Sequence, residues 1–243
     1  MSSFLVLWDV DYTLVNTYGV GRHLYRAAFA DLYGRELPEA ADGASMAGRT
    51  DRAIALEVLG LAGVPDPRGQ VGRFEAALGR LAPGVTGMVA ASGKALPGAR
   101  AALAALARRP AAVQSVLTGN VRPVAEAKLA PLGLTAHLDL DVGAYGDEHE
   151  IRSGLVHLAR DRAAAAYGRG FGGQAAVLIG DTPLDVEAAL ATGARAVGVA
   201  TGEFSPAELE AAGAHAVLAD LGDTAAVLAA VLAGLGDYQP RPA

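Results

Sequence analysis

The stretch FLVLWDVDYT, residues 4–13, largely determines the fold class that the sequence predicts. Its first five residues form a short, continuous apolar run, which is typical of a strand in a parallel sheet whose two faces are both covered. The run ends at two carboxylates, Asp9 and Asp11. Because ligands bind at the carboxyl ends of the strands in an open parallel sheet, this acidic pair is a candidate functional site.

Further apolar runs predict the other strands of the sheet. Clear runs lie at residues 112–117, 175–179 and 196–199, and weaker candidates lie at 138–142 and 216–218. Segments of helical length separate them, at residues 98–108, 121–130, 153–167, 183–191 and 206–212. Strands that alternate with helices indicate an α/β fold with a doubly wound, Rossmann-like parallel sheet.

Two of the predicted helices carry start signals. Thr182 precedes Pro183, and Ser205 precedes Pro206, with Glu208 two residues further on. A hydroxyl at the N-cap and a proline at the first helical position favour a helix start, so we expect helices to begin directly after Thr182 and Ser205.

The region after the first strand breaks the alternation of strands and helices. It contains helical segments at about residues 22–32, 51–59 and 68–81, and no convincing strand. We therefore expect residues 17–93 to form an inserted α-helical cap. Residues 1–16 and 94–243 would then form the α/β core, with Gly93 and Pro97 in the returning hinge.

The composition and charge of the chain disfavour some classes of binding partner. The 243 residues are 52% hydrophobic, enough to bury a sizeable core, and the net charge of −6 argues against nucleic acid or an anionic membrane as partner. The chain has no cysteine, which excludes disulfides and thiol chemistry. We find no signal peptide and no apolar stretch of the ~20 residues that span a bilayer, so we expect a cytoplasmic protein.

Polar clusters follow two more of the predicted strands. The clusters are Thr118, Gly119 and Asn120 after the run at 112–117, and Gly180, Asp181 and Asp185 after the run at 175–179. Four carboxylates, those of Asp9, Asp11, Asp181 and Asp185, should therefore converge. Two like charges ~4 Å apart repel by roughly 4 kcal/mol at an effective dielectric constant of 20, so the cluster needs a cation or raised pKa values. Carboxylate oxygens select a hard ion such as Mg²⁺, which prefers few carboxylates together with phosphate oxygens of a substrate.

The motifs resemble those of the haloacid dehalogenase (HAD) superfamily. Its first motif, Asp-x-Asp-x-Thr, is matched by residues 9–13, the second by the strand ending in Thr118, and the fourth, Gly-Asp-x-x-x-Asp, by residues 180–185. The motifs occur in the family's order, and each follows a predicted strand. The helical insert and the sequence Leu-Pro-Gly at 96–98 resemble the branch of phosphoglycolate phosphatase and β-phosphoglucomutase, and the resemblance covers nearly the whole chain.

The resemblance implies a role for each acidic residue. Asp9 would attack phosphorus and form an aspartyl-phosphate, while Asp11 would protonate the leaving oxygen and later activate water. Mg²⁺ would be held by Asp9, Asp181 and the backbone carbonyl of Asp11, with Asp185 as a direct or water-mediated ligand. Because alternate residues of a strand point to opposite faces, the chain must turn just after Asp9 to bring Asp11 into the pocket.

The resemblance also implies a phosphate-binding loop and a cation. Thr118 and the backbone amides of Gly119 and Asn120 would bind the phosphoryl oxygens. Arg152 occupies the place of the basic residue that offsets the charge of the nucleophile and the phosphoryl group. We favour Arg152 over Lys128, which we interpret as a solvated helix residue.

Residues 48–51 of the insert resemble a cap loop that faces the core site in this branch. Arg49 could bind an anionic group of the substrate or lie on the surface, and Thr50 could contact the substrate or cap the following helix. Tyr12 departs from the glycine that is usual in the first motif, and we expect its ring to pack rather than to form a pocket wall.

The resulting interpretation is a Mg²⁺-dependent phosphatase of a small phosphorylated metabolite. The main alternative is a phosphotransferase or mutase of the β-phosphoglucomutase type, which would share the same core. A 2-haloacid dehalogenase is disfavoured because Asp11 supplies a second carboxylate that such an enzyme is not expected to have. A non-catalytic binding protein is disfavoured because every acidic motif position is filled.

Overall fold

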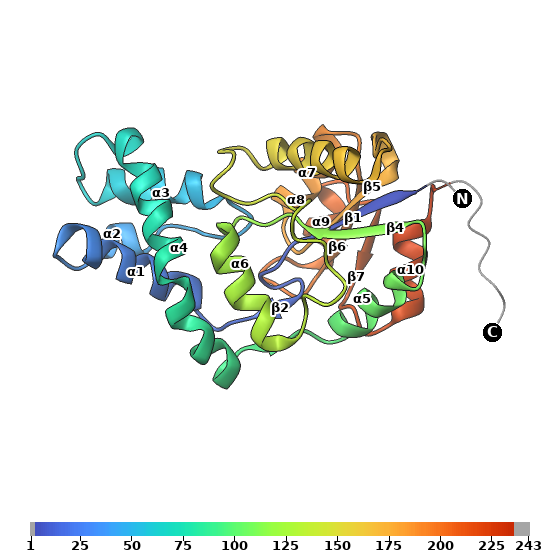
Figure 1. Cartoon of the computed structure of the whole chain (residues 1–243), viewed down its shortest axis with the longest axis horizontal. Coiled ribbons are helices and arrows are strands. Elements are labelled where there is room, and N and C mark those ends of the chain that lie inside the picture. The colour runs from blue at the N-terminus through green and yellow to red at the C-terminus, as the bar shows by residue number, and fades with distance from the viewer. Residues whose placement is uncertain (1–2, 236–243) are drawn as a thin grey trace.

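The computed structural model describes residues 3–235, and its central element is a five-stranded parallel sheet (Figure 1). The strands are β1 (Phe4–Trp8), β4 (Ala112–Val116), β5 (Ala176–Gly180), β6 (Arg195–Val199) and β7 (Ala216–Leu218), in the order β4-β1-β5-β6-β7. All neighbouring pairs are parallel. The strand order reverses at β1, so the carboxyl end of this strand lies at the switch point where open sheets bind ligands.

Helices cover both faces of the sheet, as the doubly wound prediction requires. One face carries α7 (Arg152–Tyr167), α8 (Pro183–Ala191) and α9 (Pro206–Ala211), and the other carries α5 (Ala99–Ala107), α6 (Arg122–Leu129) and α10 (Thr224–Leu232). Short 3-10 helices η1 (Ala130–Leu132) and η2 (Gly173–Ala175) complete the connections. Side chains of β1 alternate between the two layers, because Leu5 and Leu7 pack with the first set of helices and Val6 and Trp8 with the second.

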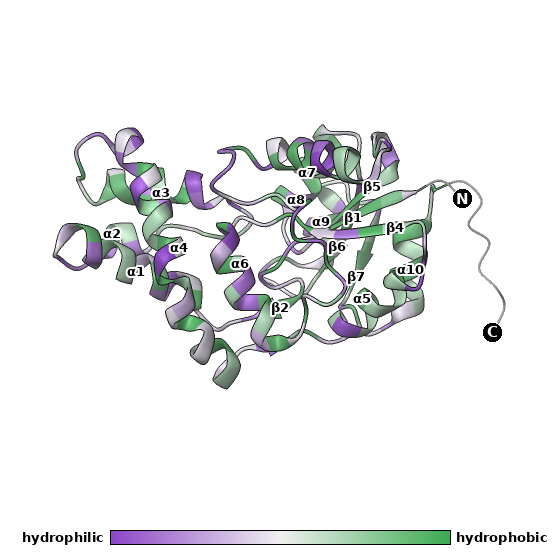
Figure 2. Cartoon of the chain, in the orientation of Figure 1, coloured by the Kyte–Doolittle hydropathy of each residue, from purple (hydrophilic) through white to green (hydrophobic). Residues whose placement is uncertain are grey.

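The strands are apolar almost throughout, which fits a sheet covered on both faces. Figure 2 shows them mainly in hydrophobic green, with a hydrophilic stretch in β4. Gln114 of β4 is buried there, and its side chain accepts a hydrogen bond from Trp8 Nε1 (3.2 Å) and donates one to the carbonyl of Leu103 (3.0 Å). The buried amide is therefore satisfied on both sides.

One predicted strand is absent. Residues 138–142 form turns and loops, although their apolar residues made them a weaker strand candidate. The Asp139 carboxylate accepts a hydrogen bond from the backbone N–H of Asp141 (3.1 Å), so a side-chain-closed turn replaces the extended conformation. The predicted helix starts at Thr182 and Ser205 are confirmed, since each residue forms a capping box with the side chain at the third helical position.

The insert is helical. It contains α1 (Val20–Tyr33), the single turn α2 (Glu39–Asp42), α3 (Asp51–Leu61) and α4 (Pro67–Ser92), and these lie together at one end of the molecule in Figure 1. Within residues 17–93 no strand is formed. Helix α4 continues eleven residues beyond the predicted end, through Pro83. Its buried face runs on without interruption through Ala82, Val85 and Val89, and this burial outweighs the one hydrogen bond that proline removes.

The two chain crossings between the sheet and the helical insert lie side by side. Strands β2 (Val15–Asn16) and β3 (Lys94–Ala95) form a short antiparallel pair, and the backbone N–H of Leu96 donates to the carbonyl of Leu14 (2.9 Å). The outward crossing continues through Tyr18 and Gly19, both in the left-handed region at φ 48° and 90°. The two crossings thus form one narrow connection.

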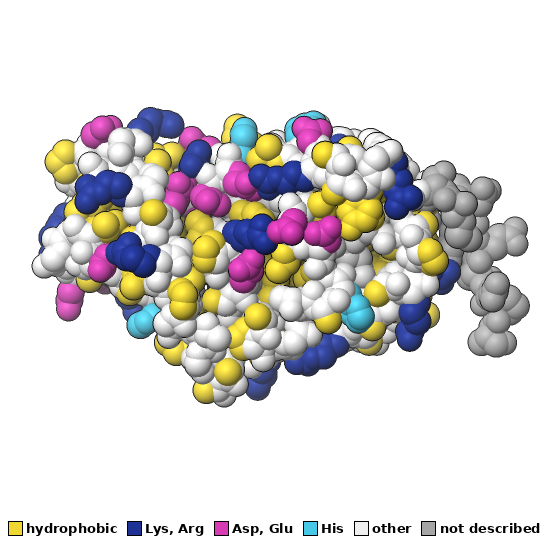
Figure 3. All heavy atoms as spheres, in the orientation of Figure 1, with side chains coloured by type: hydrophobic (Ala, Val, Ile, Leu, Met, Phe, Trp, Pro, Cys, Tyr) yellow, Lys and Arg dark blue, Asp and Glu magenta, His cyan; other side chains and the backbone are white. Residues whose placement is uncertain are grey.

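Charges of both signs are mixed on the outer surface. Figure 3 shows acidic and basic side chains side by side across the face in view, and exposed ion pairs such as Arg26 with Asp42 and Arg122 with Glu126 lie on the surface. Pairs of this kind contribute little to stability. Within residues 3–235, no helix combines the length and the apolar character that crossing a bilayer requires.

Candidate active site

The turn after β1 brings both acidic residues of the first motif into one pocket. The backbone N–H of Asp9 donates to the carbonyl of Ile179 (2.8 Å), which continues the pairing of β1 with β5. The chain then reverses at Tyr12, whose φ is 55°, and the N–H of Tyr12 donates to the carbonyl of Val15 (2.7 Å). Asp9 and Asp11 consequently line the same pocket of about 270 Å³ between the sheet and the insert. The predicted turn is confirmed.

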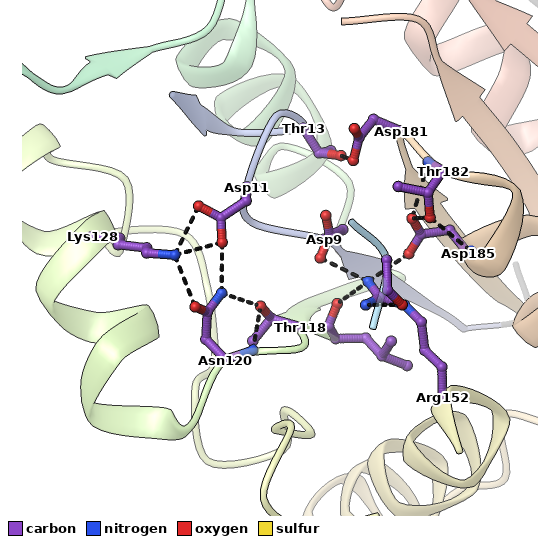
Figure 4. Close-up of polar contacts among 12 residues, drawn as sticks. Asp9, Asp11, Thr13, Thr118, Asn120, Lys128, Arg152, Asp181, Thr182 and Asp185 are labelled. Atoms are coloured by element: carbon purple, nitrogen blue, oxygen red, sulfur yellow. Dashed lines mark hydrogen bonds and ion pairs between the residues drawn. The ribbon is translucent and has the colours of Figure 1, made fainter. Parts of the chain in front are cut away.

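Asp9 lies in a buried group of three carboxylates with one guanidinium (Figure 4). Asp9, Asp181 and Asp185 each place one oxygen within 4.8 Å of the others. Arg152 Nη2 lies 2.7 Å from Asp9 Oδ1 and 2.5 Å from Asp185 Oδ1. The residues come from the ends of β1 and β5 and from the starts of α7 and α8, so the sheet topology alone assembles the group.

Burial and mutual repulsion shift the ionisation of this group. Burial raises the pKa of Asp9 above its ordinary value; Arg152 opposes this, whereas the charges of Asp185 and Asp11 add to it. Burial, followed by the charges of Asp9 and Asp185, likewise raises the pKa of Asp181. The pKa of Arg152 is raised by the carboxylates of Asp185 and Asp9, despite the opposing effect of burial. The site therefore favours an additional cation whenever its carboxylates are ionised.

The donor set fits a divalent metal. Three carboxylates and one guanidinium, all ionised, carry a formal charge of −3 + 1 = −2. Asp185 Oδ1 is buried and makes no well-aligned hydrogen bond, although it lies close to Arg152. All the available ligand atoms are carboxylate oxygens, the type that Mg²⁺ prefers.

Asp185 is held in place by its own helix start. Its Oδ2 accepts hydrogen bonds from the hydroxyl of Thr182 (2.7 Å) and from the backbone N–H of Thr182 (3.2 Å). A Cβ at Gly180 would lie within 2.1 Å of the Asp185 carboxyl carbon. Glycine at the end of β5 therefore leaves the space in which the carboxylate folds back toward the sheet.

Asp11 points to a second group of polar side chains, away from the three carboxylates (Figure 4). Lys128 Nζ lies 2.8 Å and 2.6 Å from the two Asp11 oxygens and 2.8 Å from Asn120 Oδ1. Asn120 Nδ2 donates to Asp11 Oδ2 (2.7 Å) and to Thr118 Oγ1 (2.8 Å). Of the four predicted metal-binding residues, Asp11 alone directs its side chain away from the group of Asp9, Asp181 and Asp185.

The pocket thus holds two buried cations. Arg152 lies against Asp9, where sequence reasoning put it, but the interpretation of Lys128 as a solvated helix residue is wrong. Lys128 is only 2% exposed. The sequence did carry a signal for the burial of Lys128. A spacing of three and then four residues places it on the same face of a helix as Val121 and Val124.

The predicted phosphate-binding loop lies between the two groups. Thr118 is fully buried, and its hydroxyl accepts a hydrogen bond from the backbone N–H of Asn120 (3.2 Å). That amide is engaged in this structure, although it was expected to face a phosphoryl oxygen. Gly119 packs against the insert, since a Cβ there would lie 2.0 Å from the carbonyl oxygen of Arg49. Loop and insert therefore meet backbone to backbone.

In the loop at residues 48–51 of the insert, Arg49 lines the pocket and Thr50 caps the start of α3. The Arg49 guanidinium lies 2.5 Å from Glu57 and donates to the carbonyl of Ser45 (2.9 Å). Thr50 Oγ1 accepts from the backbone N–H of Ala53 (3.2 Å) as the N-cap of α3 and donates to the carbonyl of Glu150 (2.9 Å). The capping alternative describes the position of Thr50 in this structure.

Asp51 joins the insert to the core, a contact that sequence reasoning missed. Its backbone N–H donates to the carbonyl of Gly119 (2.7 Å), and its Oδ2 accepts from the backbone N–H of Val121 (2.7 Å). Its Oδ1 accepts from the hydroxyl of Tyr25 (2.8 Å). Burial raises the pKa of Asp51 to about 6. The carboxylate therefore ties α1 and α3 of the insert to the start of α6.

Two further residues of the first motif lie in or near the pocket. The Tyr12 side chain is 39% exposed and lines the pocket, so the expectation that its ring packs into the protein is wrong. Its backbone lies in the left-handed region, at φ 55°, as part of the turn that follows Asp9. Thr13 is buried, and its hydroxyl lies 3.5 Å from Asp181 Oδ1.

Comparison with known proteins supports the resemblance. The family model described as haloacid dehalogenase-like hydrolase matches residues 6–190. The fold is similar to that of a hydrolase from Pseudomonas syringae, with a TM-score of 0.62 and 22% identity over 94% of this chain and 98% of that one. A predicted phosphatase from Clostridium acetobutylicum gives 0.63 and 19%, over 90% and 94% of the two chains. A candidate beta-phosphoglucomutase from Thermotoga maritima gives 0.58 and 20%, over 94% and 98%. No match was found among curated proteins.

Proposed function

Because the chain belongs to the haloacid dehalogenase-like hydrolase family, we propose that it is a Mg²⁺-dependent phosphatase of a small phosphorylated metabolite. The observation that carries the proposal is the arrangement of Asp9 and Asp11. One turn directs both carboxylates into one pocket, yet each has its own cationic partner, Arg152 for Asp9 and Lys128 for Asp11. Two carboxylates in different environments suit two different roles.

In the first step we assign the role of nucleophile to Asp9. Its carboxylate oxygen forms a bond to phosphorus while the bond between phosphorus and the leaving oxygen breaks, and the product is an aspartyl-phosphate. The proton that the leaving oxygen requires comes from Asp11. The Arg152 guanidinium, at 2.7 Å from Asp9, lies where it can also offset the charge of a bound phosphoryl group.

In the second step Asp11 takes the opposite role. It accepts a proton from a water molecule as the water oxygen attacks phosphorus, and the bond between phosphorus and Asp9 breaks. Inorganic phosphate leaves, and both carboxylates return to their starting states. Thr118, buried next to Asn120, contributes a hydroxyl to the wall of the pocket that would contact the phosphoryl oxygens.

The metal-binding residues in this proposal are Asp9, Asp181 and Asp185, together with the backbone carbonyl of Asp11. Support comes from the convergence of the three carboxylates and from the buried Oδ1 of Asp185, which pairs with Arg152 but makes no well-aligned hydrogen bond. A bound Mg²⁺ would supply positive charge that offsets the repulsion between the nucleophile and an anionic phosphate. Thr13 and Thr182 support Asp181 and Asp185 through their hydroxyls.

We also propose that residues 17–93 act as a cap over a core formed by residues 1–16 and 94–243. The narrow connection through β2 and β3 supports this division, because two adjacent crossings can serve as a hinge. In the present structure the contacts of Asp51 with Gly119 and Val121 hold the insert against the core. A closed cap would exclude bulk water from the phosphoryl transfer.

A β-phosphoglucomutase-type transfer would use the same two carboxylates. It would differ only in the second step, where a sugar hydroxyl replaces water. Product analysis with sugar phosphates distinguishes the two, since a mutase yields an isomeric phosphate and a phosphatase yields inorganic phosphate. A 2-haloacid dehalogenase is not expected to need a second carboxylate, so Asp11 and its partner Lys128 in the pocket disfavour this alternative.

Metal removal tests the proposed function. Chelator-treated protein should not release phosphate from p-nitrophenyl phosphate or from a panel of sugar and carboxylic-acid phosphates. Added Mg²⁺ should restore the activity. Undiminished hydrolysis in excess EDTA would contradict the metal requirement, and no phosphate release from any ester with Mg²⁺ would contradict the phosphatase function itself.

A further inference from the structure

Lys128 is a buried lysine whose position calls for an explanation. The chain has two lysines, and Lys128 lies on the buried face of α6 beside Val124 and Ala125. An ammonium group is rarely buried unless it is paired, because desolvation of the charge is costly. Replacing both ends of a buried ion pair with apolar groups is often neutral for stability, so the pair need not be present for the sake of the fold.

The partners of Lys128 all belong to the pocket. Its ammonium group donates to both oxygens of Asp11, at 2.8 Å and 2.6 Å, and to Asn120 Oδ1 at 2.8 Å. Asn120 in turn donates to Asp11 Oδ2 (2.7 Å), so two side chains hold the carboxylate from one side. The Asp11 side chain remains 33% exposed, which leaves it accessible from the pocket.

The two cationic side chains of the pocket, Arg152 and Lys128, contact different residues. Arg152 lies between Asp9 and Asp185, on the side where a phosphoryl group would be transferred. The side-chain hydrogen bonds of Lys128 within residues 3–235 go to Asp11 and Asn120, on the side of the proposed general acid. Figure 4 shows the two groups on opposite sides of Asp9. Lys128 is therefore not a duplicate of Arg152.

From this geometry, and resting on the proposed phosphatase function, we propose that Lys128 is a positioning residue for Asp11. Asp11 lies on a tight turn, and its carboxylate could rotate away from a leaving oxygen. Two hydrogen bonds from Lys128 and one from Asn120 fix the orientation of the carboxylate. Proton transfer requires a heavy-atom distance of about 2.6–3.2 Å, so a fixed orientation should raise the rate of leaving-group protonation.

Leaving groups of different basicity test this role. An alkoxide must be protonated as it departs, whereas p-nitrophenolate leaves without a proton. We expect Lys128→Met, which removes the charge with little change in volume, to slow the phosphorylation step for an alkyl phosphate by about 10- to 100-fold. The same step with p-nitrophenyl phosphate should change by less than about 3-fold. Rapid-quench measurement of alcohol or phenol release in a single turnover with Mg²⁺ isolates this step from the later attack by water.

Three further proteins complete the experiment. Lys128→Gln keeps one donor and should fall between wild type and Lys128→Met, and it remains informative if the methionine variant does not fold. Arg108→Met removes an exposed cation from the end of α5 and should leave both rates unchanged. Equal losses on the two esters, or no loss on either, would overturn the positioning role. A wild-type protein that hydrolyses neither ester would show instead that the proposed function has failed.

Discussion

Arg152 Nη2 lies 2.7 Å from Asp9 Oδ1, and both side chains are almost completely buried at the carboxyl end of β1. The first residue of α7 thus reaches a residue 143 positions earlier in the chain. This pair links the proposed nucleophile to the cation that offsets its charge.

Replacing Arg152 with Met should impair both stability and activity. Breaking a buried ion pair from one side leaves uncompensated charge and costs about 3–5 kcal/mol. Loss of a donor to the phosphoryl group should lower kcat by at least about 100-fold. Arg160→Met is a matched control on the same helix, because Arg160 donates to the backbone carbonyls of Thr192 and Gly173 outside the pocket. The melting temperature and kcat should both fall for Arg152→Met. For Arg160→Met only the melting temperature should fall. Full activity of the Arg152→Met protein would contradict a role for Arg152 in catalysis.

Asp9→Asn should abolish turnover while the fold remains intact. The amide has nearly the same shape as the carboxylate but is a poor nucleophile, so kcat should fall at least about 100-fold. Asp42→Asn, at an exposed ion pair of the insert, is the control and should leave kcat unchanged. Circular dichroism checks that both variants fold. Retention of more than about one hundredth of wild-type kcat by Asp9→Asn would rule out a covalent role for Asp9.

The contribution of Asp51 to stability should depend on pH. Burial raises its pKa to about 6 in the folded protein, although the hydrogen bonds from Val121 and Tyr25 and the charge of Lys128 oppose the shift. The unfolded value is about 4, so between pH 4 and 6 the folded chain holds a proton that the unfolded chain has lost. The contribution of Asp51 to the free energy of unfolding is therefore fully present below about pH 4. It declines as the pH rises from about 4 to about 6, and the total decrease is roughly 3 kcal/mol.

Comparison of wild type with Asp51→Asn isolates this effect. Asparagine cannot titrate and retains an oxygen that can accept from the Val121 amide. The melting temperature of the wild type, relative to that of the variant, should decrease from pH 4.5 to pH 7.5. A difference that does not vary with pH would show that Asp51 keeps an ordinary pKa in the folded protein.

Arg49→Ala should affect substrates that reach the insert more than those that do not. Arg49 lines the pocket from the insert, although its guanidinium is paired with Glu57 in this structure. For a metabolite that contacts the insert, KM should rise or kcat should fall, whereas a small generic ester should be hydrolysed nearly as before. Equal losses on both kinds of substrate would assign Arg49 to the structure of the loop, through Glu57 and the carbonyl of Ser45.

Most of the sheet and part of the site could be predicted from local sequence patterns. Asp9 and Asp181 are detectable because each follows a short apolar run, and parallel strands bring such run ends together. Arg152 could be predicted only through the resemblance to a family. Residues 138–142 were misread as a strand because turn formation by Asp139 outweighs the weak apolar pattern there.

The residues that sequence analysis missed depend on contacts between distant segments. Asp51 meets Val121 across 70 positions, and no local pattern in either segment indicates the contact. Lys128 was misread because a charged residue on a helix is usually solvated. Its spacing from Val121 and Val124 placed it on the buried face, but only the turn at Tyr12 shows that Asp11 lies there to pair with it.

The most direct test of the account is detection of a phosphorylated Asp9. In Asp11→Asn the second step lacks its general base, so the aspartyl-phosphate should accumulate after incubation with Mg²⁺ and a reactive ester such as p-nitrophenyl phosphate. Acid quenching and peptide mass spectrometry should then find a phosphoryl group on Asp9, and none in the Asp9→Asn, Asp11→Asn double variant. Phosphate release by the wild type without any phosphoryl group on Asp9 of the trapped protein, or with the group on another residue, would contradict the proposed mechanism.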